Sequence, residues 1–124
     1  MKLISILIII NIISFILSKS YTYSSTFEIK GGIKTKKTWE CSSTPTFKVN
    51  IGIDECEAPI DHGFTLDVYL EKKGKITSVS NGCVNLHYGG EVTLEGDGEG
   101  EYYIYLHHPT GHRVKGSIDI DITC

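Results

Sequence analysis

Apolar and polar residues alternate along most of the chain with a period of two. Apolar side chains occupy positions 47, 49, 51 and 53, with polar residues or glycine between them, and the same alternation runs over 64–70. Successive side chains of a β-strand point to opposite faces, so this pattern predicts strands with one face on a core and the other in water. Beyond residue 20 no stretch has the spacing of an amphipathic helix, and almost no helix is expected. Further strands are predicted over 22–30, 33–41, 75–80, 83–88, 91–95, 101–107 and 114–123.

Glycine-rich turns separate the predicted strands. Gly31-Gly32 lies between the first two of them and predicts a hairpin, because glycine readily adopts the positive φ of a tight hairpin turn. Short strands with a turn about every ten residues predict one antiparallel β-sandwich or small barrel, and the sequence does not choose between the two. Chain reversals are expected on the same grounds at 73–74, 81–82, 89–90 and 109–111.

The first twenty residues have the order of a secretory signal peptide. An apolar run over 3–17 follows Lys2, and Ser18 and Ser20 supply small side chains before a cleavage site after Ser20. As a helix the run would cover roughly 23 Å at about 1.5 Å per residue, less than the ~30 Å hydrocarbon core of a bilayer. We therefore predict a signal peptide over 1–20 and a secreted, extracellular domain over 21–124 without a transmembrane anchor in its mature form.

Secretion would place the four cysteines in an oxidising compartment, where disulfides form. Cys124 is in phase with the apolar residues of the last predicted strand, and Cys41 is in phase with Trp39, so both are expected to point inward. Among the three possible pairings we favour Cys41–Cys124 together with Cys56–Cys83, which makes two disulfides. A zinc site is the alternative, but the cysteines lack the short paired spacing of structural zinc sites.

The charge of the mature chain is acidic and unevenly distributed. Without Lys2 and Lys19, ten of the 12 basic residues remain against 15 acidic ones, a formal charge of −5. Because phosphate binding needs clustered Lys and Arg, nucleic acid is not expected as a partner. Residues 21–53 carry five Lys and two Glu, so the first part of the domain is basic while the remainder is strongly acidic.

Acidic residues and glycine alternate over 95–101. Glu95, Asp97 and Glu99 are candidate calcium ligands, since Ca²⁺ takes six to eight oxygen ligands. Apart from this calcium ion, no cofactor is expected. The EF-hand pattern is not met, because Leu106 stands where a bidentate Glu is needed. The alternative is a flexible, solvated hairpin loop whose glycines serve the turn. The acidic segment 54–61 presents the same two alternatives.

Three histidines flank the turn at Pro109. His107, His108 and His112, with His87 from another strand, are candidate ligands of zinc or copper. A metal site needs three or four convergent groups, however, and a shared turn guarantees only proximity. We therefore favour the alternative that these histidines are exposed polar residues of a loop.

A row of aromatic residues runs along the strand predicted over 101–107. Tyr103, Tyr105 and His107 share one face, and positions 102, 104 and 106 form the face expected in the core. Tyr69, and also Tyr88, would extend the row if their strands lay alongside. Exposed tyrosines can stack on sugar rings or anchor a protein partner, so Tyr103, Tyr105, His107 and Tyr69 are candidate ligand-binding residues. The alternative is ordinary cross-strand packing.

The motifs of common catalytic classes are missing from the sequence. It contains no nucleophile elbow, glycine-rich phosphate loop or zinc-protease helix, and no cysteine that is expected to stay a free thiolate. Carboxylates are plentiful, but a glycosidase pair is defined by a separation in space that an acidic loop does not reveal. We expect that the protein is not an enzyme.

Several segments resemble an MD-2-related lipid-recognition domain. They are residues 39–51, which include Trp39 and Cys41, then Pro59 and Gly63, and finally 100–104 and 118–122. Such domains are secreted, disulfide-bonded β-sandwiches that hold lipids between their sheets, so the resemblance implies that fold and an apolar ligand. Residues 64–122 are also similar to the small β-sandwich domains that follow secreted bacterial peptidases.

These observations lead to three functional expectations, all for a secreted, non-catalytic binding domain. The first is a domain that takes a small apolar or lipid ligand between its sheets. The alternative is an adhesion module that binds an extracellular glycan or protein on the face of Tyr103 and Tyr105, with weak calcium dependence. The third is a small inhibitor or toxin, which would follow from the disulfides and the compact size alone.

Overall fold

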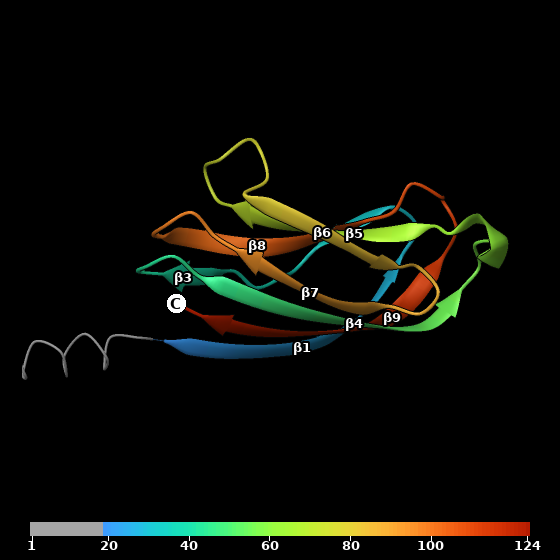
Figure 1. The fold of residues 1–124 in the computed structure, drawn as a ribbon, viewed down its shortest axis with the longest axis horizontal. Coiled ribbons are helices and arrows are strands. Elements are labelled where there is room, and N and C mark those ends of the chain that lie inside the picture. Colours follow the sequence, from blue (N-terminus) through green and yellow to red (C-terminus); the bar gives the residue numbers. More distant parts are fainter. Residues whose placement is uncertain (1–18) are drawn as a thin grey trace, which may run out of the picture.

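The computed structural model describes residues 19–124, and almost all of the predicted signal peptide lies outside this range. The described part is all-β, as the alternation predicts, with nine strands and one short 3-10 helix (Figure 1). None of its helices is long and apolar enough to cross a membrane. In chain order the elements are β1 (Ser20–Ile29), β2 (Gly32–Lys34), β3 (Trp39–Cys41), β4 (Thr46–Cys56), η1 (Ile60–His62), β5 (Thr65–Lys72), β6 (Ser80–Asn85), β7 (Gly90–Glu95), β8 (Gly100–His107) and β9 (Val114–Thr123).

The strands form two antiparallel sheets that pack face to face as a sandwich (Figure 1). The first, sheet A, has the order β1-β9-β4-β7, and the second, sheet B, has the order β2-β8-β5-β6 with β3 also paired to β8. Strands that are far apart in sequence are therefore neighbours: Ser20 of β1 lies opposite Thr123 of β9. The predicted sandwich is confirmed.

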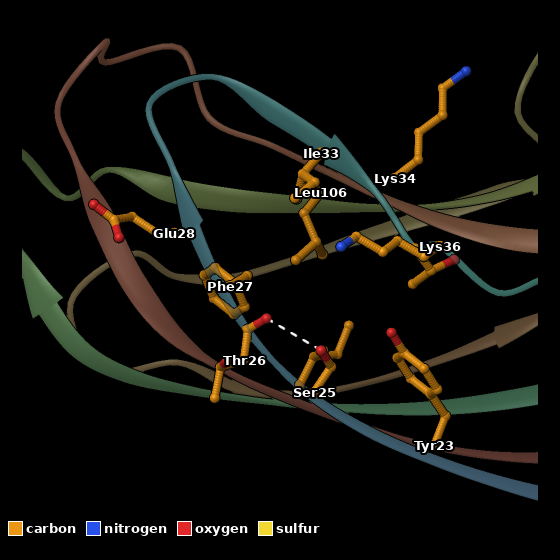
Figure 2. Close-up of a pocket in the computed structure, with 11 residues that line it drawn as sticks. Tyr23, Ser25, Thr26, Phe27, Glu28, Ile33, Lys34, Lys36 and Leu106 are labelled. Atoms are coloured by element: carbon orange, nitrogen blue, oxygen red, sulfur yellow. Dashed lines mark hydrogen bonds between the residues drawn. The ribbon is translucent and has the colours of Figure 1, made fainter.

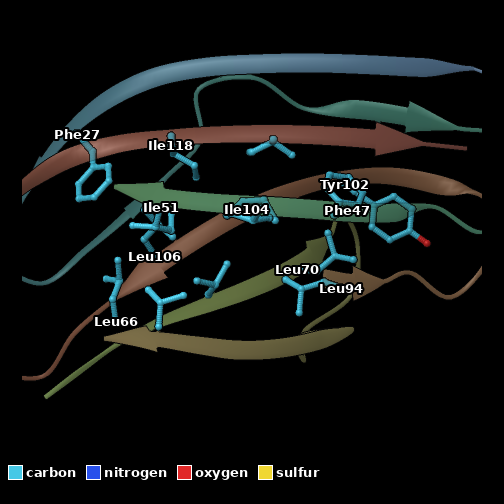
Figure 3. Packing of buried hydrophobic residues seen from close by; sticks show 14 of the residues in the cluster. Phe27, Phe47, Ile51, Leu66, Leu70, Leu94, Tyr102, Ile104, Leu106 and Ile118 are labelled. Carbon is cyan, nitrogen blue, oxygen red and sulfur yellow. The ribbon is translucent and has the colours of Figure 1, made fainter. Parts of the chain in front are cut away.

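The core lies between the sheets and is made by the inward positions of the alternating strands (Figure 3). Phe47 and Val49 of β4 face Leu66 and Val68 of β5, and all four side chains are fully buried. Each side chain of this size contributes ~1.5–3 kcal/mol when it leaves water. Trp39 closes one part of the core, because its ring packs edge-on against a tyrosine and a phenylalanine at centroid distances of 5.4 and 5.8 Å.

The prediction of a hairpin at Gly31-Gly32 is wrong. The strands on either side belong to different sheets, since β1 pairs with β9 and β2 pairs with β8. The glycines therefore lie where the chain crosses from one sheet to the other. Gly32 also has a packing role, because a β-carbon at this position would overlap the hydroxyl group of Tyr105. The strand predicted over 33–41 is divided into β2 and β3, which both pair with β8.

The strand predicted over 75–80 and the turn predicted at 81–82 are also wrong. The chain turns at Gly74, which has a φ of 87°, and continues as a loop in which Ile76 is fully exposed. Asn81 and Gly82 lie inside β6. Gly82 allows β7 to approach closely, since an added β-carbon would lie 3.1 Å from a methyl group of Val92. This glycine marks a close contact between strands and not a reversal of the chain.

One of the two predicted disulfides is present. Cys41 of β3 is bonded to Cys124 after β9, with a Cα–Cα distance of 5.4 Å, so the bond joins the two sheets. The prediction of Cys56–Cys83 is wrong, and both residues are free thiols. Cys56 ends β4 of sheet A and packs against the core, whereas Cys83 lies on the exposed outer face of sheet B, because its neighbour Val84 points inward.

Candidate functional site

The two outer faces of the sandwich differ in composition. Across the described strands, the outward side chains of sheet A are small, polar or charged, as at Ser24, Asp119, Asn50 and Glu91 along one row. The outer face of sheet B carries a group of aromatic side chains, which we call the tyrosine face. It consists of Tyr69 on β5 and of Tyr103, Tyr105 and His107 on β8.

The rings of the tyrosine face form a row across two strands. Tyr69 lies directly opposite Tyr105 in the pairing of β5 with β8, and their ring centroids are 6.0 Å apart at an interplanar angle of 33°. His107 continues the row at 6.1 Å from Tyr105 and 26°. Tyr103 follows along β8, with the Lys34 ammonium 5.5 Å from its ring centroid. The structure thus brings together the four residues predicted from the strand pattern.

Polar groups surround this row. Asp67 lies opposite His107, and the Glu71 carboxylate accepts a 2.8 Å hydrogen bond from the Ser78 hydroxyl. Partial burial, and then the negative charge of Asp67, raise the pKa of Tyr69 above its usual value, because both disfavour the charged phenolate. A shallow hollow of about 290 Å³ is lined by Tyr69, Glu71, Ser78, Tyr105 and His107.

Some residues of this surface were not singled out from the sequence. Asp67 and Glu71 stand two positions before and after Tyr69, so their side chains share its face of β5. This alternation is the sequence pattern that would have identified them. Lys34 could not be found in this way, because its place depends on the pairing of β2 with β8. Tyr88 does not join the row, since it lies in the turn between β6 and β7 and is 74% exposed.

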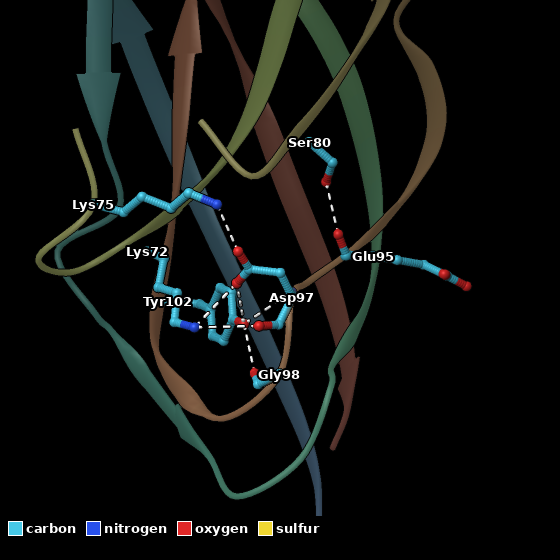
Figure 4. Close-up of polar contacts among 7 residues, drawn as sticks. All are labelled: Lys72, Lys75, Ser80, Glu95, Asp97, Gly98 and Tyr102. Atoms are coloured by element: carbon cyan, nitrogen blue, oxygen red, sulfur yellow. Dashed lines mark hydrogen bonds and ion pairs between the residues drawn. The ribbon is translucent and has the colours of Figure 1, made fainter. Parts of the chain in front are cut away.

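The three predicted calcium ligands do not converge on one point. Asp97 is held by the ammonium groups of Lys72 and Lys75, at 3.0 and 2.6 Å, and these contacts lower its pKa to about 2. Figure 4 shows the Glu95 side chain pointing away from Asp97. Glu99 is exposed. Calcium binding here stays a prediction, and it would require that both lysines leave Asp97.

The second acidic segment, 54–61, is partly neutralised as well. Glu55 and Glu57 lie 3.2 and 3.6 Å from the guanidinium group of Arg113, which also contacts Glu28 of β1 at 2.6 Å. Among the side chains that the structure describes, no group of three or more His, Cys, Asp or Glu is placed to hold a metal ion.

The histidines point to different parts of the molecule. His108 is 1% exposed, which corrects the expectation of an exposed loop residue, and its Nδ1 lies 2.9 Å from the Thr110 hydroxyl. Burial lowers its pKa, because the charged imidazolium loses hydration. The Nε2 atom of His87 makes a weak contact with the sulfur of Cys56, at 3.8 Å. His107 belongs to the tyrosine face.

A cleft opens between β1 and β2, at one side of the sandwich (Figure 2). This edge cleft has a volume of about 200 Å³ and is lined on its apolar side by Phe27, Ile33, Leu106 and Ile118. Sites that enclose a drug-sized ligand usually measure about 300–1,000 Å³. The edge cleft is therefore small for a whole lipid.

The chain matches no family model and no curated protein. Several solved structures share its fold. The pre-peptidase C-terminal domain of a collagenase from Bacillus anthracis is 12% identical, with 83% of this chain and 88% of that one covered and a TM-score of 0.51. PliG from Aeromonas hydrophila, a periplasmic inhibitor of g-type lysozyme, is 14% identical, with 85% and 87% covered and a TM-score of 0.51.

PliG from Salmonella Typhimurium is 22% identical, with 83% of this chain and 86% of that one covered, at a TM-score of 0.40. At these identities the two likenesses with a TM-score of 0.51 concern the fold alone.

Proposed function

We propose that the protein is a non-catalytic, extracellular binding domain that holds a glycan on its tyrosine face. The observation that supports this most is the row of Tyr69, Tyr105 and His107, which are partly exposed on one outer face. Extracellular placement is supported by the apolar run of residues 3–17 and by the disulfide, since disulfides persist in oxidising compartments.

The chemistry of this face suits a sugar. The flat, apolar C–H face of a pyranose can stack on the rings of Tyr69 and Tyr105, because amphipathic aromatic rings offer large contact area with a polar edge. Asp67 and Glu71 carry carboxylates beside the rings, and carboxylates accept hydrogen bonds from hydroxyl groups. The surface is a shallow hollow, which suits a segment of a longer glycan better than an enclosed small molecule.

The proposal is tested with a glycan array followed by calorimetric titration of the best glycan. We expect Tyr105→Ala to weaken binding about tenfold, corresponding to about 1.4 kcal/mol for one lost stacking ring. Tyr88→Ala is the matched control, since this tyrosine is exposed but lies outside the tyrosine face, and its affinity should be unchanged. Equal binding by wild type and Tyr105→Ala would contradict the proposal.

A second candidate function is inhibition of an extracellular enzyme. It is supported by the fold shared with Aeromonas PliG and by two exposed apolar side chains outside the sheets. They are Ile60 of η1 and Tyr88 in the turn between β6 and β7, which are 57% and 74% exposed. Large apolar side chains are typical anchors of protein interfaces. The enzyme to try first is a g-type lysozyme, assayed by the clearing of a bacterial suspension.

For this second function we expect the purified protein to slow the clearing and Tyr88→Ala to weaken the inhibition about tenfold. Tyr105→Ala then becomes the control with full inhibition. Tyr105→Ala tests glycan binding and Tyr88→Ala tests inhibition, and each variant is the control for the other function. The same two variants therefore distinguish the two functions. Inhibition that is absent at micromolar protein, or that is lost with Tyr105→Ala alone, would contradict this candidate.

A further inference from the structure

The two sides of the sandwich are closed to different extents. On one side the edge strands β6 and β7 contact each other, since the Ser80 hydroxyl donates a 3.0 Å hydrogen bond to the Glu95 carbonyl. On the other side the edge strands are β1 and β2, and β2 has only three residues. β1 is ten residues long and pairs on one side, with β9 (Figure 1). Among residues 19–124 no strand lies on its other side.

The hydrogen-bond pattern tells which backbone groups of β1 are free. Lys19 and Cys124 exchange two hydrogen bonds, with N–O distances of 2.8 and 2.9 Å. In an antiparallel pair, hydrogen-bonded positions recur at every second residue. The backbone N–H and C=O groups of the odd-numbered residues of β1 therefore point to β9. One of the free groups, the Thr26 carbonyl, accepts a 3.2 Å hydrogen bond from the Ser25 hydroxyl. The N–H and C=O groups that point to the free edge belong to Ser20, Thr22, Ser24, Thr26 and Glu28.

This edge lacks the features that usually prevent strand addition. Natural edge strands are commonly protected by lysine, proline, a bulge or short length. β1 contains no lysine, arginine or proline, and its register with β9 runs without interruption over all ten residues. Its one charged residue, Glu28, is bound to Arg113. The edge is therefore available for pairing with another extended chain.

The edge cleft runs beside this free edge (Figure 2). Phe27 belongs to β1 itself, Ile33 to β2, and Leu106 and Ile118 form the floor from the two sheets. A strand added to β1 would direct every second side chain inward, toward this cleft. Its volume of about 200 Å³ suits individual apolar side chains better than a whole lipid.

The surroundings of the cleft are basic. Lys34 and Lys36 line it, although the Lys34 ammonium lies over the Tyr103 ring on the outer face of sheet B. Lys30 and Lys37 are exposed in the same part of the chain. Within residues 19–124 none of these four lysines is paired with a carboxylate, although the protein has a net charge of −3. An acidic partner would supply the missing counter-charges.

We propose that an extended, acidic segment of a partner protein adds to β1 as a further strand of sheet A. Its backbone pairs with the free groups of Ser20 to Glu28, and its alternate apolar side chains enter the edge cleft. Backbone hydrogen bonds supply affinity and the cleft supplies specificity, as in other cases of strand addition. Lys34 is the one residue that adjoins both this site and the tyrosine face. The variants used for the two proposals lie elsewhere, so either proposal can fail without the other.

The first experiment uses fluorescence anisotropy with a labelled synthetic peptide of alternating Glu and Val. Two further peptides are N-methylated, one at every Val and the other at every Glu. Within one strand all Val N–H groups point to one edge and all Glu N–H groups to the other. We expect the unmodified peptide to bind, one methylated peptide to lose at least tenfold in affinity, and the other to bind nearly normally.

The second experiment uses variants of the protein with the unmodified peptide. Thr26→Pro removes a free N–H without removing a bond to β9, and proline is tolerated at such edge positions. Ile33→Asp places a carboxylate on the wall of the cleft. Each should weaken binding at least tenfold. Ile76→Asp, at a fully exposed isoleucine in the loop before β6, is the control and should bind normally.

Several results would overturn the proposal. They are no binding of the unmodified peptide, equal binding of all three peptides, or normal binding by Ile33→Asp, which remains informative if Thr26→Pro does not fold. Binding of palmitate in the cleft without binding of peptide would mean a lipid site instead. A dimer of the protein that Thr26→Pro abolishes would mean that a second copy occupies the edge.

Discussion

Asp97 shows how tertiary contacts change the chemistry expected of a single residue. As one of three acidic residues in a glycine-rich segment it is a candidate calcium ligand, but in the fold its carboxylate lies between Lys72 and Lys75 (Figure 4). Tyr102, which is buried, accepts a 3.1 Å hydrogen bond from the Asp97 N–H and donates one of 2.6 Å to the Gly98 carbonyl. The loop is therefore held by side chains of neighbouring segments, namely Lys72 of β5, Lys75 in the turn after it, and Tyr102 of β8.

This arrangement predicts a loss of stability in acid. The folded-state pKa of Asp97 is lowered to about 2 from an ordinary value of 3.8, first by Lys75 and then by Lys72. The unfolded chain therefore binds the proton more readily, and the contribution of Asp97 is present above about pH 4 and lost as the pH falls toward 2. We expect Asp97→Asn to lower the melting temperature at pH 6 and to lower it much less at pH 2, where about half of the folded protein carries a protonated Asp97.

Glu99→Gln is the control for this measurement, since Glu99 is an exposed neighbour with no ion pair in the described residues. Its melting temperature should follow that of the wild type at both pH values. If Asp97→Asn instead melted below the wild type by the same amount at pH 6 and pH 2, the ion pairs would not be the source of its effect.

Single strands were predicted more reliably than their partners. The alternation over 47–53 and 64–70 is local, so it identifies β4 and β5 and their buried faces without reference to the rest of the chain. Pairing depends on distant residues, and glycine in a turn indicates a reversal without indicating which sheet the chain joins next. For this reason Gly31-Gly32 was mistaken for a hairpin, although β1 lies beside β9.

Irregular segments were predicted least well. The loop before β6 contains Ile76 and Val79, and their apolar character suggested a strand over 75–80. Ile76 is fully exposed, so its apolar side chain contributes nothing to the core. Gly82 was mistaken for a turn residue because the sequence does not distinguish a glycine that reverses the chain from one that lets β7 approach.

At the scale of the whole molecule, a disulfide cross-links the two sheets. The Cys41–Cys124 disulfide closes a loop with a sequence separation of 83 residues. A disulfide that closes a loop of this length stabilises the folded state chiefly by restricting the unfolded chain, typically by roughly 2–5 kcal/mol. We expect the double variant Cys41→Ser with Cys124→Ser to lose stability in this range, measured as the free energy of unfolding in urea.

Cys83→Ser is the matched control, because Cys83 is a free, exposed thiol on the outer face of sheet B. It should unfold at the same urea concentration as the wild type. A double variant with an unchanged free energy of unfolding would show that non-covalent packing between the sheets is sufficient.

The candidate sites illustrate the same division. Tyr103, Tyr105 and His107 could be placed on one face from their spacing alone, because successive residues of a strand alternate between faces. That Tyr69 joins them was decided by the pairing of β5 with β8, which the sequence does not encode locally. The edge cleft had no sequence signal, since Phe27 and Leu106 come from different sheets.

The sequence by itself determined the all-β class, the inward and outward faces of most strands, and the preference for Cys41–Cys124, because each depends on a short-range pattern with a period of two. Only the tertiary structure decided which strands are neighbours, that Cys56 and Cys83 face different surroundings, and that β1 keeps a free edge beside an apolar cleft. These properties depend on residues far apart in the chain, which come together only when the two sheets pack.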